Sequence, residues 1–183
     1  MMQPIVAYAL AGSVISSVAV WAFLQYPGLL VWAAFIGWAS LHHCGGGALA
    51  LRKSVSCNTF GVVTAWAVAL LVVHGLIPLP VPISAALWVA LATPFVILMS
   101  RVNALDAVPS SFYGFASTFA YLVQTPGKFS IETMSTLRLD NALIAVTASL
   151  IIGNILGYLQ VLMGNALIKR FHHQEPAIEI VGH

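Results

Sequence analysis

Apolar residues in this chain run in long stretches, and the breaks between the stretches fall at proline, glycine or polar clusters. A membrane-spanning helix needs about 20 mostly apolar residues. The pattern predicts six such spans, at residues 4–25, 27–49, 58–77, 82–102, 109–123 and 139–169. The fifth is shorter than a bilayer requires, so we expect it to enter partway, to tilt or to be completed by neighbouring protein.

The composition agrees with a protein that lies mostly in lipid. Hydrophobic residues make up 60% of the 183 positions and charged residues only 7%, whereas a soluble domain carries roughly a quarter charged residues. We therefore expect an all-helical integral membrane bundle, with the first apolar run retained as a helix rather than removed as a signal peptide. The net charge of +2 is spread thinly, which disfavours a nucleic-acid partner and leaves the lipid bilayer as the expected surroundings.

The carboxylates all fall in predicted connections or in the tail. These residues are Asp106, Glu132, Asp140, Glu175 and Glu179. Ion-coupled transport commonly uses a carboxylate inside the membrane, so their placement disfavours coupling, although backbone carbonyls and histidine remain alternatives. The chain also contains no phosphate-binding loop, nucleophile elbow or zinc-protease helix, and we expect neither an enzyme nor a bound cofactor or metal.

Lysine and arginine are distributed unevenly among the connections. With the N-terminus inside, five of them fall on the cytoplasmic side, namely Arg52, Lys53, Arg101, Lys169 and Arg170. Only Lys128 and Arg138 fall outside. By the positive-inside rule we expect both termini in the cytoplasm. We expect a single transmembrane domain over residues 1–170 and a polar cytoplasmic tail over residues 171–183.

One short motif occurs twice. Phe-x-Gly-aromatic-Ala-Ser stands at residues 35–40 and again at residues 112–117, at an offset of 77 residues. The offset also aligns Ser16 with Thr93 and Trp32 with Pro109, and it fails after Ser117. We interpret this as two inverted repeats of three helices, at about residues 4–77 and 82–169, because an odd number of crossings reverses the direction of the second copy.

The repeated motif has two interpretations. Its glycine, alanine and serine are the small residues that let helices approach closely in lipid, so the motif can be a helix crossing and nothing more. In the second interpretation, the side chains also surround a narrow route for a small polar solute. The residues of that constriction would be Phe35, Trp38, Ser40, Phe112, Phe115 and Ser117.

Three further polar residues lie within predicted spans. His42 and His43 follow the first motif and precede Cys44, and either histidine could face a cavity or lie near the cytoplasmic headgroups. A His/Cys metal or haem site is a less favoured alternative, because adjacent helical residues point about 100° apart. Asn154 lies between Gly153 and Gly157 in a small-xxx-small pattern, and it serves either helix packing or pore lining.

Three segments carry a resemblance to a known family. They are LLVWAAFIGWAS at residues 29–40, GVVTAW at residues 61–66, and the pattern VPxxFxGxAxTF at residues 108–119. In these segments and their order the chain resembles a bacterial family of small multi-pass inner-membrane proteins of unknown function. The resemblance implies a bacterial plasma-membrane location and no substrate. The family usually has aromatic or small residues where His42, His43 and Cys44 stand here.

From these patterns we expect a small membrane channel or facilitator for a small neutral or weakly ionised solute. A chain of 183 residues has little material to enclose a wide pore, so we also expect a homo-oligomer. The alternative class is a non-transporting membrane scaffold or regulatory protein, in which the repeats serve only to pack helices.

Overall fold

The computed structural model describes residues 3–172 and is all-helical over that range. Its main helices are α1 (Pro4–Gln25), α2 (Val31–His43), α3 (Ala48–Val73), α4 (Val81–Leu98), α5 (Val108–Gln124) and α7 (Ala142–His172). Two single 3₁₀ turns, η1 (Met99–Arg101) and η2 (Asn103–Leu105), follow α4, and the short helix α6 (Ile131–Met134) precedes α7. The predicted tail lies outside the described residues, apart from the last turn of α7.

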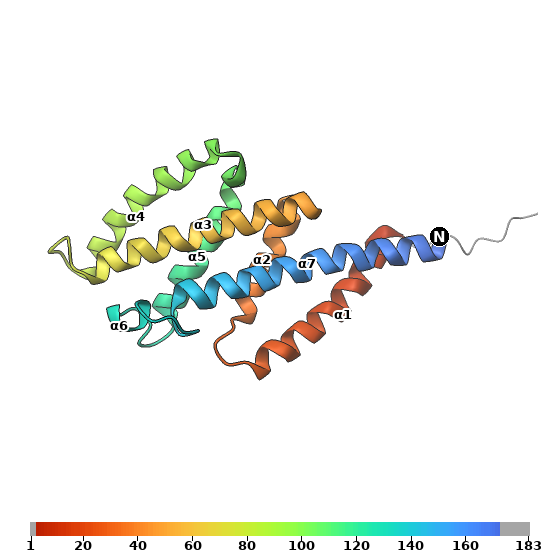
Figure 1. The fold of residues 1–183 in the computed structure, drawn as a ribbon, viewed down its shortest axis with the longest axis horizontal. Helices are drawn as coiled ribbons and strands as arrows, with labels where there is room; N and C mark the ends of the chain where they lie inside the picture. Colours follow the sequence, from red (N-terminus) through yellow and green to blue (C-terminus); the bar gives the residue numbers. More distant parts are fainter. Residues whose placement is uncertain (1–2, 173–183) are drawn as a thin grey trace, which may run out of the picture.

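Helices α3 and α7 form the centre of the bundle. The short helices α2 and α5 cross them, α2 mainly against α7 and α5 mainly against α3, while α1 packs on α7 and α4 packs on α3 (Figure 1). The most apolar windows of α3 and α7 are each 44% buried within the protein, against 17% for those of α1 and α4. The outer pair therefore presents most of its apolar side chains outward.

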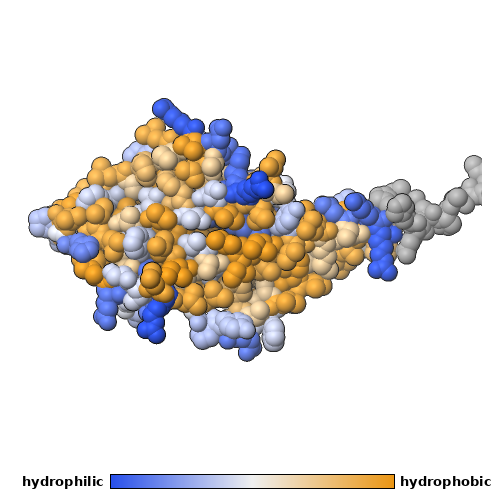
Figure 2. All heavy atoms as spheres, viewed as in Figure 1, coloured by the Kyte–Doolittle hydropathy of each residue, from blue (hydrophilic) through white to orange (hydrophobic). Residues whose placement is uncertain are grey.

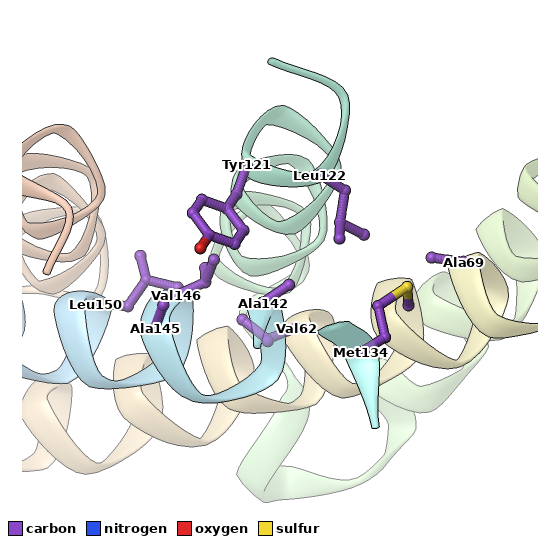
Figure 3. Packing of buried hydrophobic residues seen from close by; sticks show 9 residues of the cluster. All are labelled: Val62, Ala69, Tyr121, Leu122, Met134, Ala142, Ala145, Val146 and Leu150. Atoms are coloured by element: carbon purple, nitrogen blue, oxygen red, sulfur yellow. The ribbon is translucent and has the colours of Figure 1, made fainter. Parts of the chain in front are cut away.

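The larger of the two apolar core clusters within residues 3–172 joins four helices. Its buried members come from α3, α5, α6 and α7: Val62, Ala69, Tyr121, Leu122, Met134, Ala142, Ala145, Val146 and Leu150 (Figure 3). Met134 has no exposed surface, and its carbonyl accepts from Asn141 Nδ2 at 2.8 Å, so both its side chain and its backbone hold the single turn of α6 in place. Burial of a methionine of this kind contributes roughly 1.5–3 kcal/mol.

Within the described residues, four helices are long and apolar enough to cross a membrane. They are α1, α3, α4 extended by η1 (Val81–Arg101), and α7 as far as Phe171. The surface around them is dominated by apolar residues, as expected for a membrane protein (Figure 2). The sequence predicted six spans, but α2 has 13 residues and α5 has 17. At 1.5 Å per residue they are about 20 and 25 Å long, shorter than a hydrocarbon core of about 30 Å.

The helix boundaries differ most from the prediction around the glycine triplet. Gly45 and Gly46 have φ angles of 107° and 75°. This left-handed conformation cannot continue a right-handed helix, so α2 ends at His43. Glycine adopts it readily, whereas residues with a Cβ rarely do. Helix α3 then begins at Ala48, ten residues before the predicted start. The predicted span 27–49 is therefore wrong at both ends. Arg52 and Lys53, predicted to lie in a connection, belong to the first turns of α3.

Candidate functional site

The glycine of the first motif is a point of backbone contact between α2 and α7. A Cβ added at Gly37 would overlap the carbonyl of Leu150. In the reverse direction, a Cβ at Gly153 would overlap the carbonyl of Ala34. The two helices are therefore in contact through their main chains, which only glycine permits at these two positions.

The glycine of the second motif makes the same kind of contact between α5 and α3. A Cβ at Gly114 would overlap the carbonyl of Asn58, and a Cβ at Gly61 would overlap the carbonyl of Ser111. In the helices that contain the motif, Ala34 and Gly37 of α2 precede their counterparts, Ser111 and Gly114 of α5, by 77 positions. On the long helices, Asn58 and Gly61 precede their counterparts, Leu150 and Gly153, by 92 positions. The two copies of the motif thus make equivalent crossings.

A cluster of buried polar side chains lies where α2, α3, α5 and α7 meet, and we call it the polar cluster. Its members are Ser40, Ser54, Asn58, Ser110 and Asn154, each at most 1% exposed. Ser40 Oγ lies 2.6 Å from Ser54 Oγ and donates to Ser110 Oγ at 2.9 Å. Asn58 Nδ2 donates to Ser40 Oγ at 3.1 Å and to the Ser110 carbonyl at 2.8 Å. Hydroxyls and amides from four helices therefore share one hydrogen-bonded site.

Asn154 closes the cluster from the side of α7. Its Nδ2 donates to Asn58 Oδ1 and to the Leu150 carbonyl, both at 2.8 Å. Its Oδ1 is buried and has no hydrogen-bond partner. A buried amide oxygen without a donor costs about 1–3 kcal/mol. The cluster thus contains an acceptor that a donor group on a small molecule could satisfy.

Sequence reasoning named Ser40 and Asn154 but missed the other three members. The sequence interpretation placed Asn58 at a helix start, where an asparagine is a common cap. Because α3 begins at Ala48, Asn58 instead lies ten residues inside the helix. The spacing of Ser54 and Asn58, four residues apart on one helical face, is the signal that could have found them.

Polar residues continue along α5 from the polar cluster toward the opposite end of the bundle. Ser110, Gly114, Ser117 and Tyr121 are spaced four, three and four residues apart, which places them on one face of the helix. Ser117 is 1% exposed and its hydroxyl has no hydrogen-bond partner. The hydroxyl of Ser111, on an adjacent row, is also buried and unpartnered. We call Ser110, Ser117 and Tyr121 the α5 row, which extends about 16 Å along the helix.

The α5 row ends at an open pocket of about 640 Å³. The turn between α1 and α2 contributes Pro27 and Gly28 to its wall, and the last turn of α5 contributes Tyr121. Its charged lining consists of Lys128 and Arg138 with one carboxylate, Asp140. We call this space the terminal pocket. It lies at the end of the bundle that holds α6 and the α1–α2 turn (Figure 1).

Asp140 is held in place by its neighbours. Its Oδ1 accepts a hydrogen bond from Thr136 Oγ1 at 2.8 Å. This bond, together with the positive charges of Lys128 and Arg138, keeps the pKa of Asp140 below its usual value of 3.8. The terminal pocket therefore carries two positive charges and one negative charge at neutral pH.

The aromatic residues of the two motifs lie apart. Phe35 and Trp38 stack on each other at 5.9 Å, and Phe35 is 42% exposed. Phe112 and Phe115 lie 6.3 Å apart and pack with residues of α3 and α4. Within residues 3–172 no aromatic contact joins one pair to the other. Of the six predicted constriction residues, Ser40 is in the polar cluster and Ser117 is in the α5 row.

His42, His43 and Cys44 have three different sets of neighbours. His42 Nε2 lies 2.8 Å from Gln160 Oε1, which also accepts from Trp38 Nε1 at 2.9 Å. His43 Nδ1 lies 3.4 Å from the hydroxyl of Tyr113, and Cys44 Sγ lies 3.2 Å from Ser110 Oγ. Both histidines are exposed. Of these three residues, Cys44 is therefore the one that contacts a member of the polar cluster.

Comparison with known proteins identifies a family and no individual relative. The model of a family described as a protein of unknown function, DUF1097, matches residues 9–165. This match covers most of the chain and includes both copies of the motif, the polar cluster and the terminal pocket. The resemblance found in the sequence, to a family without assigned function, is thereby confirmed. Neither a curated protein nor a solved structure matches the chain.

Proposed function

The chain belongs to the DUF1097 family, and because that family has no assigned function, we propose one from the geometry. The protein is a small membrane channel or facilitator for a small neutral or weakly ionised solute. The observation that carries this proposal is the polar cluster, which continues as the α5 row. Polar groups buried among membrane helices usually face a solute or ion pathway or bond with one another. Here Ser111, Ser117 and Asn154 each keep one oxygen without a partner.

The proposed route begins at the terminal pocket and passes Tyr121, Ser117 and Ser110 to reach the polar cluster. Each oxygen along it offers a hydrogen bond in place of one to water, which lowers the cost of removing a polar solute from solvent. Because these oxygens are buried, the proposal includes a closed state, in which the route has no opening at the cluster. A rotation of one pair of crossed helices against the other would open it.

We further propose that the chain consists of two inverted halves, α1–α2–α3 and α4–α5–α7. The paired glycine contacts support this, because they relate α2 to α5 by 77 residues and α3 to α7 by 92. The two offsets differ by the length of an insertion between α5 and α7, where α6 lies. Such halves meet at a common interface, and transporters of this type hold their solute there. The polar cluster lies at that interface.

We also propose where the protein lies in the cell and how its subunits assemble. The family resemblance implies a bacterial inner membrane, and we place the protein there. The unequal distribution of lysine and arginine supports an orientation with both termini in the cytoplasm, which puts the terminal pocket on the outer side. We propose a homo-oligomer in which each subunit has its own route, since the α5 row is buried within a single chain. This arrangement does not require an axial pore.

The test is a stopped-flow shrink-and-swell assay on proteoliposomes with water, glycerol, urea, ammonia and short-chain acids. We expect one of these to enter faster than into empty liposomes. Ser117→Ala should then reduce that rate about tenfold, the effect of losing one hydrogen bond worth about 1.4 kcal/mol. Ser13→Ala is the matched control, because Ser13 is an exposed serine of α1 bonded only to its own helix. Equal rates in full and empty liposomes would contradict the proposal.

The second candidate is a non-transporting scaffold, and the glycine crossings favour it. Small residues that allow backbone contact are sufficient to hold membrane helices together without any solute. A scaffold predicts no flux of any solute in the wild type or in Ser117→Ala. It also predicts that the unpartnered hydroxyl of Ser117 is dispensable.

A further inference from the structure

The charged residues of the terminal pocket are arranged for a ligand of negative charge. Lys128 and Arg138 both line the pocket, and the only carboxylate among the lining residues is Asp140. Among residues 3–172 the only ion pair within 4 Å joins Lys53 and Asp106, outside this pocket. Neither cation of the pocket is therefore neutralised by direct contact with a carboxylate.

Asp140 is directed toward its own segment of the chain. One of its oxygens accepts from Thr136 Oγ1, and its backbone carbonyl accepts from the Tyr121 hydroxyl at 3.2 Å. These bonds hold Asp140 just before α7, where its carboxylate offsets one of the two positive charges without direct contact with either cation. The charge of the lining is then +1, which favours a ligand that carries one negative charge.

We propose that the terminal pocket is a binding site for a singly charged oxyanion, held by Lys128 and Arg138. A guanidinium matches two oxygens of a carboxylate or phosphate in a bidentate pair, and an ammonium adds a point charge. The apolar part of the wall, at Pro27 and Leu30, accommodates a short hydrocarbon group. This inference rests on the proposed function in one respect, because it narrows the transported solute to a weak acid captured as its anion.

Two sources can supply such an oxyanion. One is a small soluble carboxylate, which would reach the α5 row from this pocket. The other is the phosphodiester of an anionic lipid, since a pocket at the end of a bundle of this length lies at the depth of the headgroups. The chemistry of recognition is the same for both, so they are distinguished by experiment.

The binding test uses acetate titrated into the purified full-length protein by calorimetry, with acetamide as its neutral isostere. We expect saturable acetate binding in the millimolar range and none for acetamide. Lys128→Gln with Arg138→Gln should weaken acetate binding at least tenfold. Arg101→Gln is the matched control, because Arg101 is an exposed cation that does not line this pocket. An unchanged thermal melt establishes that the double variant is folded.

The lipid source is tested by repeating the titration in nanodiscs. Acetate binding that persists in phosphatidylcholine nanodiscs and disappears in phosphatidylglycerol nanodiscs would support the site and assign it to a lipid headgroup. Binding that persists in both would support the site and assign it to a soluble carboxylate. Absence of saturable acetate binding in all three media, or binding unaffected by the double variant, would overturn the inference.

Flux measurements separate this inference from the proposed function. Acetate binding without flux of any solute would leave the oxyanion site standing and overturn the channel. Flux of a neutral solute without acetate binding would leave the channel standing and overturn the oxyanion site. Acetate flux that falls with the double variant would support both.

Discussion

Asn154 of α7 donates from its Nδ2 to Oδ1 of Asn58 in α3 at 2.8 Å, and this bond joins the two central helices between the two glycine crossings. Both amides are buried, and the residues are 96 positions apart in the chain. In a bundle of apolar helices, such a bond gives α3 and α7 a defined register that apolar contacts alone do not provide.

We expect a double-mutant cycle to measure this bond directly. Asn58→Ala and Asn154→Ala should each destabilise the protein by about 1–3 kcal/mol, because each leaves buried partners unsatisfied. The coupling energy between them should be about 0.6 kcal/mol, the average for bonds between membrane helices, and at most about 1.7 kcal/mol. Unfolding by sodium dodecyl sulfate in mixed micelles gives these values.

The control for that cycle is Asn103→Ala, which removes an exposed asparagine from η2. It should change stability by less than about 0.5 kcal/mol. A coupling energy of zero between Asn58 and Asn154 would show that the two amides do not stabilise each other in the folded protein.

The glycine crossings lead to a prediction about packing. Gly37→Ala and Gly114→Ala should each destabilise the protein by about 1–3 kcal/mol or more, because the new methyl group would overlap a backbone carbonyl that cannot move independently of its helix. Gly47→Ala is the control, since a Cβ at Gly47 would meet no atom within 4 Å. Thermal melting in detergent compares the three variants, and equal melting temperatures would refute the close approach.

Orientation can be tested with single cysteines. In a background of Cys44→Ser and Cys57→Ala, we expect Pro126→Cys to react with a membrane-impermeant maleimide added to intact cells, and Asn103→Cys to react only after lysis. Both positions are exposed, and they lie at opposite ends of α5. The reverse labelling pattern would place the terminal pocket in the cytoplasm.

The pKa of Asp140 predicts an acid-sensitive contribution to stability. The hydrogen bond from Thr136 and the nearby cations hold this pKa below 3.8 in the folded protein. A carboxylate whose folded-state pKa is depressed stabilises the fold above its unfolded-state pKa and loses that contribution as the pH falls through the folded-state pKa. The melting temperature of the wild type should therefore exceed that of Asp140→Asn at pH 6.

The melting-temperature difference between the wild type and Asp140→Asn should become smaller as the pH is lowered through about 4 toward 2. The carboxyl group of Asp140 is then protonated and neutral in the folded and the unfolded wild type. Thr136→Val is a second variant that removes the donor while keeping the carboxylate. A melting-temperature difference that stays constant from pH 6 to pH 2 would contradict a role for the ionised form.

Local features of the chain determined much of the fold. Helix α1 spans residues 4–25, as predicted, because a proline at its first position and the Tyr-Pro-Gly turn after it act within a few residues. Asn141 caps α7, with its Oδ1 accepting from the Leu143 amide at 2.9 Å, and asparagine is a common residue at this position. The early start of α3 was missed because the conformation of Gly45 and Gly46 is not evident from an apolar run.

By itself, the sequence determined the helical class, the apolar surface and the glycine of each repeated motif, since these depend on residue type and short-range spacing. Only the tertiary structure decided which polar residues meet. Ser40, Ser54, Asn58, Ser110 and Asn154 form one cluster because α2 and α5 cross the two central helices at the depth set by four glycines. Hydropathy records that a residue is polar, whereas its partners depend on where helices distant in the chain come into contact.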